Sequence, residues 1–339
     1  MITISQDHPL KELNTFGIAA KAYYFAEAQS LGALKELLAL KNHPHKFILG
    51  GGSNMLLTAD IDALVIHVNL KGIRIVKEDD RYVQVKVMAG ENWHNLVLWT
   101  LDQNFGGLEN LSLIPGNTGT APIQNIGAYG VELKDSFVSC EALNRTTLEL
   151  EEFTHAECQF GYRDSIFKNT AKDRYVITSV TFQLTKKDHV KHTTYGAIEG
   201  ELQKKGIKTP TIRDISNAVI AIRSAKLPDP KDLGNSGSFF KNPVLSKEAF
   251  ARFSDHYPQA PHYALPDGTF KVPAGWLIEQ CGLKGKRKGD AGVHERQALV
   301  LVNHGNATGQ EILGLAYEVM AAVQEKFNIT ISPEVNIIK

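Results

Sequence analysis

The sequence predicts an α+β protein made of two or three domains. With 339 residues, the chain is longer than one hydrophobic core usually organises. Its hydrophobic content of 43% and charged content of 22% are those of an ordinary globular protein. Helix-like and strand-like patterns also alternate along the chain instead of forming separate blocks.

The first elements alternate helix and strand. A helix at about residues 30–41 has leucines at helical spacing on one face. A short apolar strand at 47–49 runs into the glycine-rich segment 50–54. The run at 63–68 is expected to be a second buried strand.

From about residue 71 the pattern changes to a sheet of half-buried strands. In the segment 82–88, valines alternate with polar residues, which is typical of a strand with one buried face. A helix is expected at 93–103. The remaining strands of this lobe are expected at 138–143, 148–153 and 175–184.

The main domain boundary is predicted in the segment 185–209, which is polar and weakly periodic. A helix at 212–224 follows and is stopped by two prolines. The last domain is expected to contain a helix at 274–282 and a strand at 298–303. A long amphipathic helix follows, in which Thr308 and Glu311 fit a capping box at the start.

Two glycine-rich loops predict a site for a phosphate-bearing cofactor. Residues 111–130 contain four glycines, two prolines and no charged side chain or histidine, so this segment is expected to be an ordered loop. We expect its backbone N–H groups to need partners other than each other. The run 50–54 (GGGSN) is the second loop. Neither loop contains GxGxxG or GxxxxGK[ST], which argues against a Rossmann or P-loop site.

Composition excludes several other classes of protein. Thirty-seven basic residues balance thirty-seven acidic ones, so a general nucleic-acid or anionic-membrane binder is not expected. No apolar run has the length of a membrane span, and the N-terminus lacks the pattern of a signal peptide. Three scattered cysteines predict reduced thiols in a cytoplasmic protein, and no spacing indicates a metal site.

Three segments each place one reactive side chain among aromatic residues, glycines or prolines. They are FGYRDSIFK (160–168) with Arg163, GNSGSFFKNP (234–243) with Ser238, and SPEV (332–335) with Glu334. Taken singly, these residues have structural interpretations: a surface ion pair with the neighbouring aspartate, a turn serine, and an edge-strand carboxylate. The basic run 284–288 (KGKRK) is interpreted as a solvated loop in preference to a diphosphate site.

Taken together, the segments resemble those of the UDP-N-acetylenolpyruvoylglucosamine reductase (UDP-N-acetylmuramate dehydrogenase) family. The matching segments, in family order, are NTFGI (14–18), GGGSN (50–54), AGENW (89–93), GLENLSLIPG (107–116), PIQNIGAYG (122–130), FGYRDSIFK (160–168), KLPDPK (226–231), GSFFKNP (237–243), AGWLI (274–278), QALVLVN (297–303) and PEV (333–335). Tyr195 and a loop around Tyr263 resemble the longer form of the family.

The resemblance implies a two-lobed FAD-binding domain of the vanillyl-alcohol oxidase (PCMH-type) superfamily, followed by a C-terminal α/β substrate-binding domain. We place the first domain at 13–185, with lobes at 13–70 and 71–185. The substrate domain is placed at 212–328, and a C-terminal strand carrying Glu334 at 329–339.

The resemblance also implies a mechanism. NADPH reduces a non-covalently bound FAD, and hydride then passes from flavin N5 to C3 of the enolpyruvyl group of a UDP-sugar. Arg163 and Glu334 are implied to stabilise the resulting negative charge, and Ser238 to deliver a proton to C2. Arginine suits a carboxylate because its planar fork binds two oxygens. Glu334 can donate only if it is protonated, which requires a raised pKa.

Further positions are implied to bind ligands. On the flavin side they are Gly51, Gly52, Ser53, Asn54, Gly116, Gly119, Gln124, Asn125, Ile126, Gly127 and Arg223. On the substrate side they are Tyr129, Tyr162, Tyr195, Lys226, Asn242, Tyr263, Lys271 and Gln297. Tyr129 and Tyr162 are expected to position the reactants and not to take part in the chemistry.

Two alternatives stay open at this point. One is an oxidase of the same superfamily that passes electrons to O₂; the absence of His and Cys from residues 47–58 weighs against the covalent flavin that many such oxidases carry. The other is a non-catalytic sugar-nucleotide binding module, which would not need Arg163, Ser238 and Glu334 together. We expect a monomer with small-molecule ligands and with neither nucleic-acid nor membrane partners.

Overall fold

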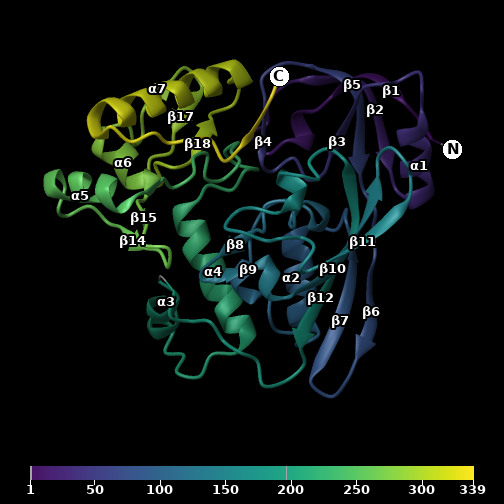
Figure 1. Cartoon of the computed structure of the whole chain (residues 1–339), viewed down its shortest axis with the longest axis horizontal. Coiled ribbons are helices and arrows are strands. Elements are labelled where there is room, and N and C mark those ends of the chain that lie inside the picture. The colour runs from purple at the N-terminus through teal and green to yellow at the C-terminus, as the bar shows by residue number, and fades with distance from the viewer. Residues whose placement is uncertain (1, 196) are drawn as a thin grey trace. The chain divides into compact units, whose positions relative to one another are not determined.

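The computed structural model describes residues 2–195 and 197–339, and Figure 1 shows its helices and strands. The contacts within the chain divide it into two units. Of the described residues, unit one comprises 2–8, 22–51, 62–195 and 197–225, and unit two comprises 9–21, 52–61 and 226–339. The chain therefore passes from one unit to the other more than once. Each unit is described by itself.

The first sheet of unit one has the strand order β1-β2-β5-β3. Its strands are β1 (Ser5–Pro9), β2 (Lys21–Ala28), β5 (Ile61–Val68) and β3 (Lys46–Leu49), with β3 and β5 parallel. Helix α1 (Leu31–Ala39) is capped by the Ser30 hydroxyl, and its three predicted leucines are buried in one core with Leu64 and Ile66 of β5. Burial of one leucine-rich face explains why this short helix is stable here.

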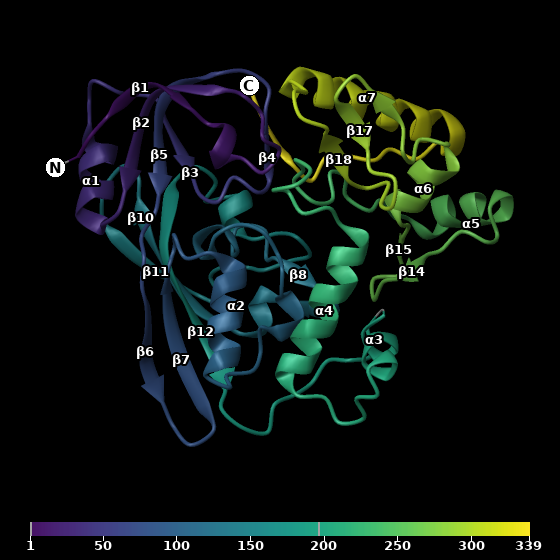
Figure 2. The same ribbon diagram turned by 180° about the vertical axis from the view of Figure 1, so that it is seen from behind.

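The second sheet of unit one has five antiparallel strands in the order β11-β10-β12-β7-β6. They are β6 (Ile73–Glu78), β7 (Tyr82–Met88), β10 (Phe137–Asn144), β11 (Leu150–Thr154) and β12 (Tyr175–Thr185). The three alternating valines of β7 are fully buried and share a core with helix α2 (Trp93–Asp102). Figure 2 shows β6 and β7 as two long neighbouring strands joined by a turn, with α2 beside them.

Two further helices of unit one, α3 (Ile198–Lys204) and α4 (Ile212–Lys226), share a small core. Its buried members include Ile198, Leu202, Val219 and Ile222. The predicted main boundary at 185–209 is therefore occupied in part by a helix, and the contacts of the chain separate the units after residue 225. The low periodicity of this segment reflects the short length of α3.

Unit one also contains short elements that shape its loops. The 3₁₀ turns are η2 (Glu109–Leu111), η3 (Thr118–Thr120), η4 (Leu133–Asp135) and η5 (Ile166–Lys168), and the hairpin β8 (Gly127–Ala128) and β9 (Val131–Glu132) lies between η3 and η4. The thiols of Cys140 and Cys158 are both free and buried, and the neighbouring Cys158 together with burial raises the pKa of Cys140.

Unit two is built around helix α7 (Gly309–Phe327) and several short sheets. The predicted capping box is present, since the Thr308 hydroxyl accepts from the Glu311 N–H and the Glu311 carboxylate accepts from the Thr308 N–H. One sheet has the order β16-β17-β18, another β13-β15-β14, and β19 pairs in parallel with β4. The remaining elements are η1 (Lys11–Leu13), α5 (Lys247–His256) and α6 (Ala274–Gln280).

The strands of unit two are short. They are β4 (Met55–Leu57), β13 (Val244–Leu245), β14 (Tyr263–Ala264), β15 (Phe270–Lys271), β16 (Arg287–Lys288), β17 (Ala291–Val293), β18 (Leu301–Asn303) and β19 (Asn336–Ile338). The strand predicted at 298–303 begins only at Leu301, because the Val300 N–H donates to the Gln297 carbonyl and forms a turn. In residues 2–195 and 197–339, no helix is long and apolar enough to cross a membrane.

Candidate active site

The part of the first glycine-rich loop that belongs to unit one, Gly50 and Gly51, meets the loop 111–130 of the same unit. A Cβ atom on Gly51 would lie 2.8 Å from Cα of Gly116 and 2.9 Å from N of Asn117, both of them backbone atoms. On Gly119 a Cβ atom would lie 2.4 Å from Cβ of Ala89. These contacts leave no room for side chains, so the glycines are required for the loops to lie this close.

Part of the charge-free loop is held by the chain itself. The Thr118 N–H donates to the Glu91 carbonyl (2.8 Å), and the Gly119 N–H donates to the Ala89 carbonyl (2.9 Å). The Gly116 carbonyl accepts from the Trp93 N–H at 3.0 Å. The expected partners other than the loop itself are thus present for Thr118 and Gly119, where carbonyls of the segment 89–93 accept. The expectation is wrong for residues 120, 121, 125 and 126, whose N–H groups donate to carbonyls within the loop.

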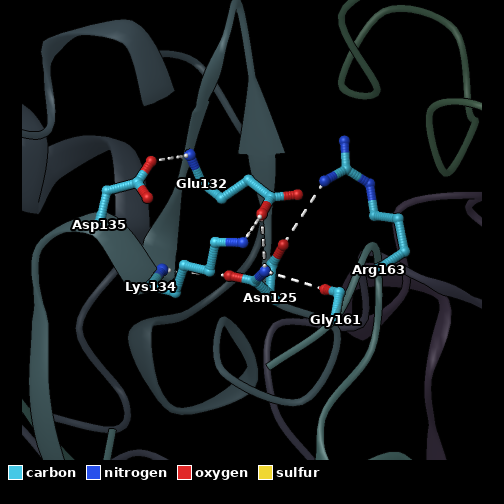
Figure 3. A network of polar contacts seen from close by, with 6 residues as sticks. All are labelled: Asn125, Glu132, Lys134, Asp135, Gly161 and Arg163. Atoms are coloured by element: carbon cyan, nitrogen blue, oxygen red, sulfur yellow. Dashed lines mark hydrogen bonds and ion pairs between the residues drawn. The ribbon is translucent and has the colours of Figure 1, made fainter. Parts of the chain in front are cut away.

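Asn125 organises the end of this loop (Figure 3). Its buried side chain donates to the Gly161 carbonyl (3.0 Å) and to Glu132 Oε2 (3.1 Å), and its Oδ1 accepts from the Lys134 N–H (3.1 Å). Asn125 has a positive φ of 43°, and its own carbonyl accepts from another partner. That partner is Arg163. The side chain of Asn125 thus joins its own loop to the segments at 132–134 and 161.

Arg163 lies against the loop through its guanidinium group. Its Nη1 donates to the Asn125 carbonyl at 3.4 Å, and its Nη2 donates to the Gly127 carbonyl. A Cβ atom on Gly127 would lie 2.8 Å from Nη1, so glycine is needed there for the arginine to approach. Arg163 itself has a φ of 54°, an unusual conformation for a non-glycine residue. The loop therefore fixes the direction of the guanidinium plane.

A second guanidinium group, that of Arg223 on α4, lies near Arg163 and Tyr129. Burial lowers the pKa of Arg223, and the positive charge of Arg163 lowers it further. Its Nε atom is buried and has no hydrogen-bond partner among the described residues. Two guanidinium groups beside a glycine-rich loop, one of them with a buried and unpartnered Nε, are suited to an anionic group. The residues of unit one thus fit a flavin dinucleotide, whose diphosphate or ring oxygens would accept from these donors.

Ser238 and Glu334 lie on adjoining extended segments of unit two. The predicted strand at 329–339 is wrong in its bounds, because β19 covers only Asn336–Ile338 and Glu334 lies in the bend before it. Ser238 pairs with Val300, and the Phe239 N–H donates to the Leu299 carbonyl (2.8 Å). On the other side, the Glu334 N–H donates to the Phe239 carbonyl at 2.8 Å. The structure therefore brings together two of the three predicted catalytic residues, and Arg163 belongs to the other unit.

Most of the predicted substrate-binding residues also belong to unit two. Lys271 and Tyr263 pair across β15 and β14, with the Lys271 ammonium 5.8 Å from the centre of the Tyr263 ring. Asn242 Oδ1 accepts from the Ala274 N–H at the start of α6 (2.9 Å). A Cβ on Gly275 of the same helix would lie 3.1 Å from Gln297 Oε1, so these segments share one region. Lys226 is exposed at the end of α4.

The remaining predicted ligand residues divide between the units. Gly52, Ser53 and Asn54 belong to unit two, where the Asn54 carbonyl accepts from the side chain of Asn336 (2.8 Å). Gln124, Ile126, Tyr129, Tyr162 and Tyr195 belong to unit one. The guanidinium of Arg163 lies 5.4 Å from the centre of the Tyr162 ring. The residues assigned to flavin, substrate and catalysis stay predictions at the level of individual contacts.

Sequence reasoning missed two buried residues beside the site, Glu109 and Asn110 of η2. They come immediately before the charge-free loop, and polar residues at such a position read as a solvated turn. The available signal was their place inside the long apolar segment from Phe105 to Ile114, where a polar pair is expected to face specific partners if it is buried. It also missed His94, whose Nδ1 accepts from the Leu113 N–H at 3.0 Å.

Two family models match the chain. Residues 24–148 match a model described as an FAD binding domain, and residues 229–338 match the C-terminal domain of UDP-N-acetylenolpyruvoylglucosamine reductase. A crystal structure of UDP-N-acetylenolpyruvylglucosamine reductase from Thermus caldophilus has a TM-score of 0.67 and covers 100% of this chain and 99% of its own, at 22% identity. These findings confirm the predicted fold class and FAD as the cofactor.

Curated relatives match at higher identity over nearly the whole chain. A UDP-N-acetylenolpyruvoylglucosamine reductase of Flavobacterium johnsoniae is 61% identical over 335 residues, which is 99% of both chains. The enzyme of the same name from Chromobacterium violaceum is 51% identical over 97% of both chains. This likeness favours the reductase over the oxidase and the binding module. The chain belongs to the UDP-N-acetylenolpyruvoylglucosamine reductase family.

Proposed function

We propose that this protein reduces the enolpyruvyl group of UDP-N-acetylglucosamine-enolpyruvate to give UDP-N-acetylmuramate, a step in peptidoglycan precursor synthesis, with NADPH as the source of electrons. The observation that carries the proposal is the 61% identity to a curated reductase over 99% of both chains. The geometry of both units agrees with it, as each carries part of the residue set that the reaction needs.

Bound FAD supplies hydride chemistry at C3 of the enolpyruvyl group. The task of the protein's own residues is to bind the carboxylate of that group and to stabilise the negative charge that spreads onto it. Arg163 is suited to both, since its two terminal nitrogens form a fork and its direction is fixed by the carbonyls of Asn125 and Gly127. A preorganised donor of this kind does not have to reorient when the charge develops.

Ser238 is proposed to give its hydroxyl proton to C2. Ser238 is exposed, as a residue that meets a substrate must be, while the neighbouring Phe239 and Phe240 are buried and anchor the segment. Glu334 is proposed to assist from the adjoining segment as a protonated carboxyl that donates to the developing charge. The backbone hydrogen bond from the Glu334 N–H to the Phe239 carbonyl holds the two segments side by side.

The substrate is a small molecule, and Tyr129, Tyr195, Lys226, Asn242, Tyr263, Lys271 and Gln297 are proposed to hold its uridine diphosphate sugar, with Tyr162 near the reacting groups. On the flavin side, Gly51–Asn54, Gly116, Gly119, Gln124–Gly127 and Arg223 are proposed. We also propose a cytoplasmic monomer with neither nucleic-acid nor membrane partners.

Steady-state turnover of the enolpyruvyl substrate with NADPH tests the function directly. Formation of one UDP-N-acetylmuramate for each NADPH consumed under anaerobic conditions is the expected result. NADPH consumption that needs O₂ and proceeds without the enolpyruvyl substrate would instead identify an oxidase.

The purified protein is expected to be yellow and to hold its FAD without a covalent bond. The glycine-rich loops approach through backbone contacts, and neither His nor Cys occurs in residues 47–58. Acid precipitation should therefore release the flavin into the supernatant, where its absorbance is measured. Colour that stays in the protein pellet would contradict this prediction.

A further inference from the structure

The segment 186–195, which we call the strap, follows β12 and carries Tyr195. Its first residue is tied to the sheet, because the Lys186 N–H donates to the Arg81 carbonyl at 2.8 Å. The Lys186 carbonyl also accepts from Asn104 Nδ2 at 3.3 Å. These bonds fix the start of the strap, and other contacts must fix the part that leads to Tyr195.

Asn110 of η2 provides such a contact. Its Nδ2 donates one hydrogen to the His192 carbonyl (2.9 Å) and the other to the Tyr129 carbonyl (3.1 Å). One buried amide thus joins the strap to the loop that ends the charge-free segment. Its Oδ1 is buried and has no hydrogen-bond partner among the described residues. The two carbonyls determine this orientation of the amide, because only the NH₂ group can donate to them.

The neighbouring Glu109 faces the same segment. Only 2% of the residue is exposed, and its Oε2 accepts from the Gly107 N–H at 2.6 Å. Burial raises the pKa of the Glu109 carboxyl, while that backbone bond and the nearby His189 and His192 of the strap oppose the rise. His189 also contacts Thr185, with its Nδ1 2.7 Å from the hydroxyl oxygen.

The far end of the strap places Tyr195 on Gly130. A Cβ atom on Gly130 would lie 3.2 Å from Cβ and 3.4 Å from Cγ of Tyr195, so the tyrosine lies directly on the glycine backbone. Gly130 has a φ of 81° and the preceding Tyr129 a φ of 50°. The carbonyl of Tyr129 that Asn110 holds is therefore part of the turn on which Tyr195 packs.

We infer that Asn110, supported by Glu109, is a positioning residue that holds the strap on the 127–130 loop and so presents Tyr195 to the substrate. This inference rests on the proposed function, in which Tyr195 binds the sugar nucleotide. A tyrosine that is already ordered loses less conformational freedom when the ligand binds, and this strengthens binding without changing the chemical step. The contact between Asn110 and the strap therefore acts on substrate affinity.

The first test replaces the donor by an acceptor of the same shape. Asn110→Asp removes both hydrogen bonds and sets carboxylate oxygens against two carbonyls, so KM for the enolpyruvyl substrate should rise about tenfold, with kcat changed less than about twofold. Flavin reduction by NADPH should be unaffected. Amide hydrogen exchange in residues 190–195 should become faster.

Asn104→Asp is the matched control. It makes the same chemical change at an exposed amide that donates to the start of the strap, and it should leave KM and the exchange of 190–195 unchanged. Asn110→Ser retains one donor and should fall between the wild type and Asn110→Asp; it also serves as the deciding variant if the aspartate variant does not fold. Unchanged KM and exchange in Asn110→Ser and Asn110→Asp would overturn the inference.

A double-mutant cycle with Tyr195→Ala identifies the route of the effect. If Asn110 acts through Tyr195, Asn110→Asp should add little to the KM of the Tyr195→Ala protein. An equal rise in both backgrounds would overturn the inference. Failure of the proposed function would look different, because the wild type would then not turn over the enolpyruvyl substrate. Hydrogen exchange in Asn110→Asp and Asn104→Asp would still decide whether Asn110 holds the strap in place.

Discussion

Replacing Ser238 by alanine is expected to leave flavin reduction by NADPH nearly unchanged and to slow the reoxidation of the flavin by the enolpyruvyl substrate by about 10²-fold or more. The two half-reactions separate because a proton donor to C2 is needed only when the substrate is reduced. Loss of a general acid usually costs a factor of this size. Stopped-flow absorbance of the flavin measures each half-reaction by itself.

Two further results make this prediction specific. Ser238→Cys should keep part of the activity, because a thiol can also donate a proton. Substrate affinity should change little in Ser238→Ala, since one hydroxyl contributes about 0.5–1.5 kcal/mol to binding. If the alanine variant loses both half-reactions equally, Ser238 has a structural role and the proposed proton transfer is wrong.

The substitution Gly51→Ala, which adds a single methyl group, is expected to weaken FAD binding by about tenfold or more. The added Cβ would lie within 3.0 Å of backbone atoms of Gly116 and Asn117, so the two loops would have to separate. Overpacking of this kind costs about 1–3 kcal/mol, and 1.4 kcal/mol is a factor of ten in affinity. Titration of the apoprotein with FAD, followed by flavin fluorescence, measures the change.

The matched control is Gly32→Ala. Gly32 lies in α1, and the nearest atom to its added Cβ is Ser30 Oγ at 3.9 Å. Alanine is favoured over glycine within a helix by about 0.5–1 kcal/mol, so this variant should be at least as stable as the wild type and should bind FAD normally. Wild-type affinity for FAD in Gly51→Ala would show that the close approach of the loops is not needed for flavin binding.

Local patterns predicted individual elements well where one face of the element is buried. The alternating valines predicted β7 at its observed bounds, 82–88, and the Thr308–Glu311 capping box predicted the start of α7. Both signals are complete within a few residues of sequence. Helix α3 was missed, because its seven residues contribute only two buried side chains to the core.

The composition of the two units could not be predicted in this way. The segments 9–21 and 52–61 belong to unit two because of contacts between distant residues, such as the Thr15 N–H with the Gly52 carbonyl and the Asn235 N–H with the Thr15 carbonyl. The predicted domains, 13–185 and 212–328, are each one continuous stretch of chain, whereas each unit combines three separate stretches.

In the candidate site, too, local patterns predicted little of what depends on contacts between distant residues. Arg163, Ser238 and Glu334 were selected as a set only through the family resemblance, since each alone has a structural interpretation. The part played by Asn125 in directing Arg163 depends on partners at Gly161, Glu132 and Lys134, and no short pattern describes such a convergence. The same is true of Asn110, whose two acceptors are at 129 and 192.

The parallel pairing of β4 with β19 has a consequence for how the protein is made. Residues 55–57 are fully enclosed in the finished unit, and their sheet partner is residues 336–338. During synthesis this apolar strand leaves the ribosome long before its partner, and such distant pairings form slowly. Unit two therefore cannot complete its folding until β19 has emerged, and nascent chains that stall earlier should be the forms that chaperones and proteases recognise.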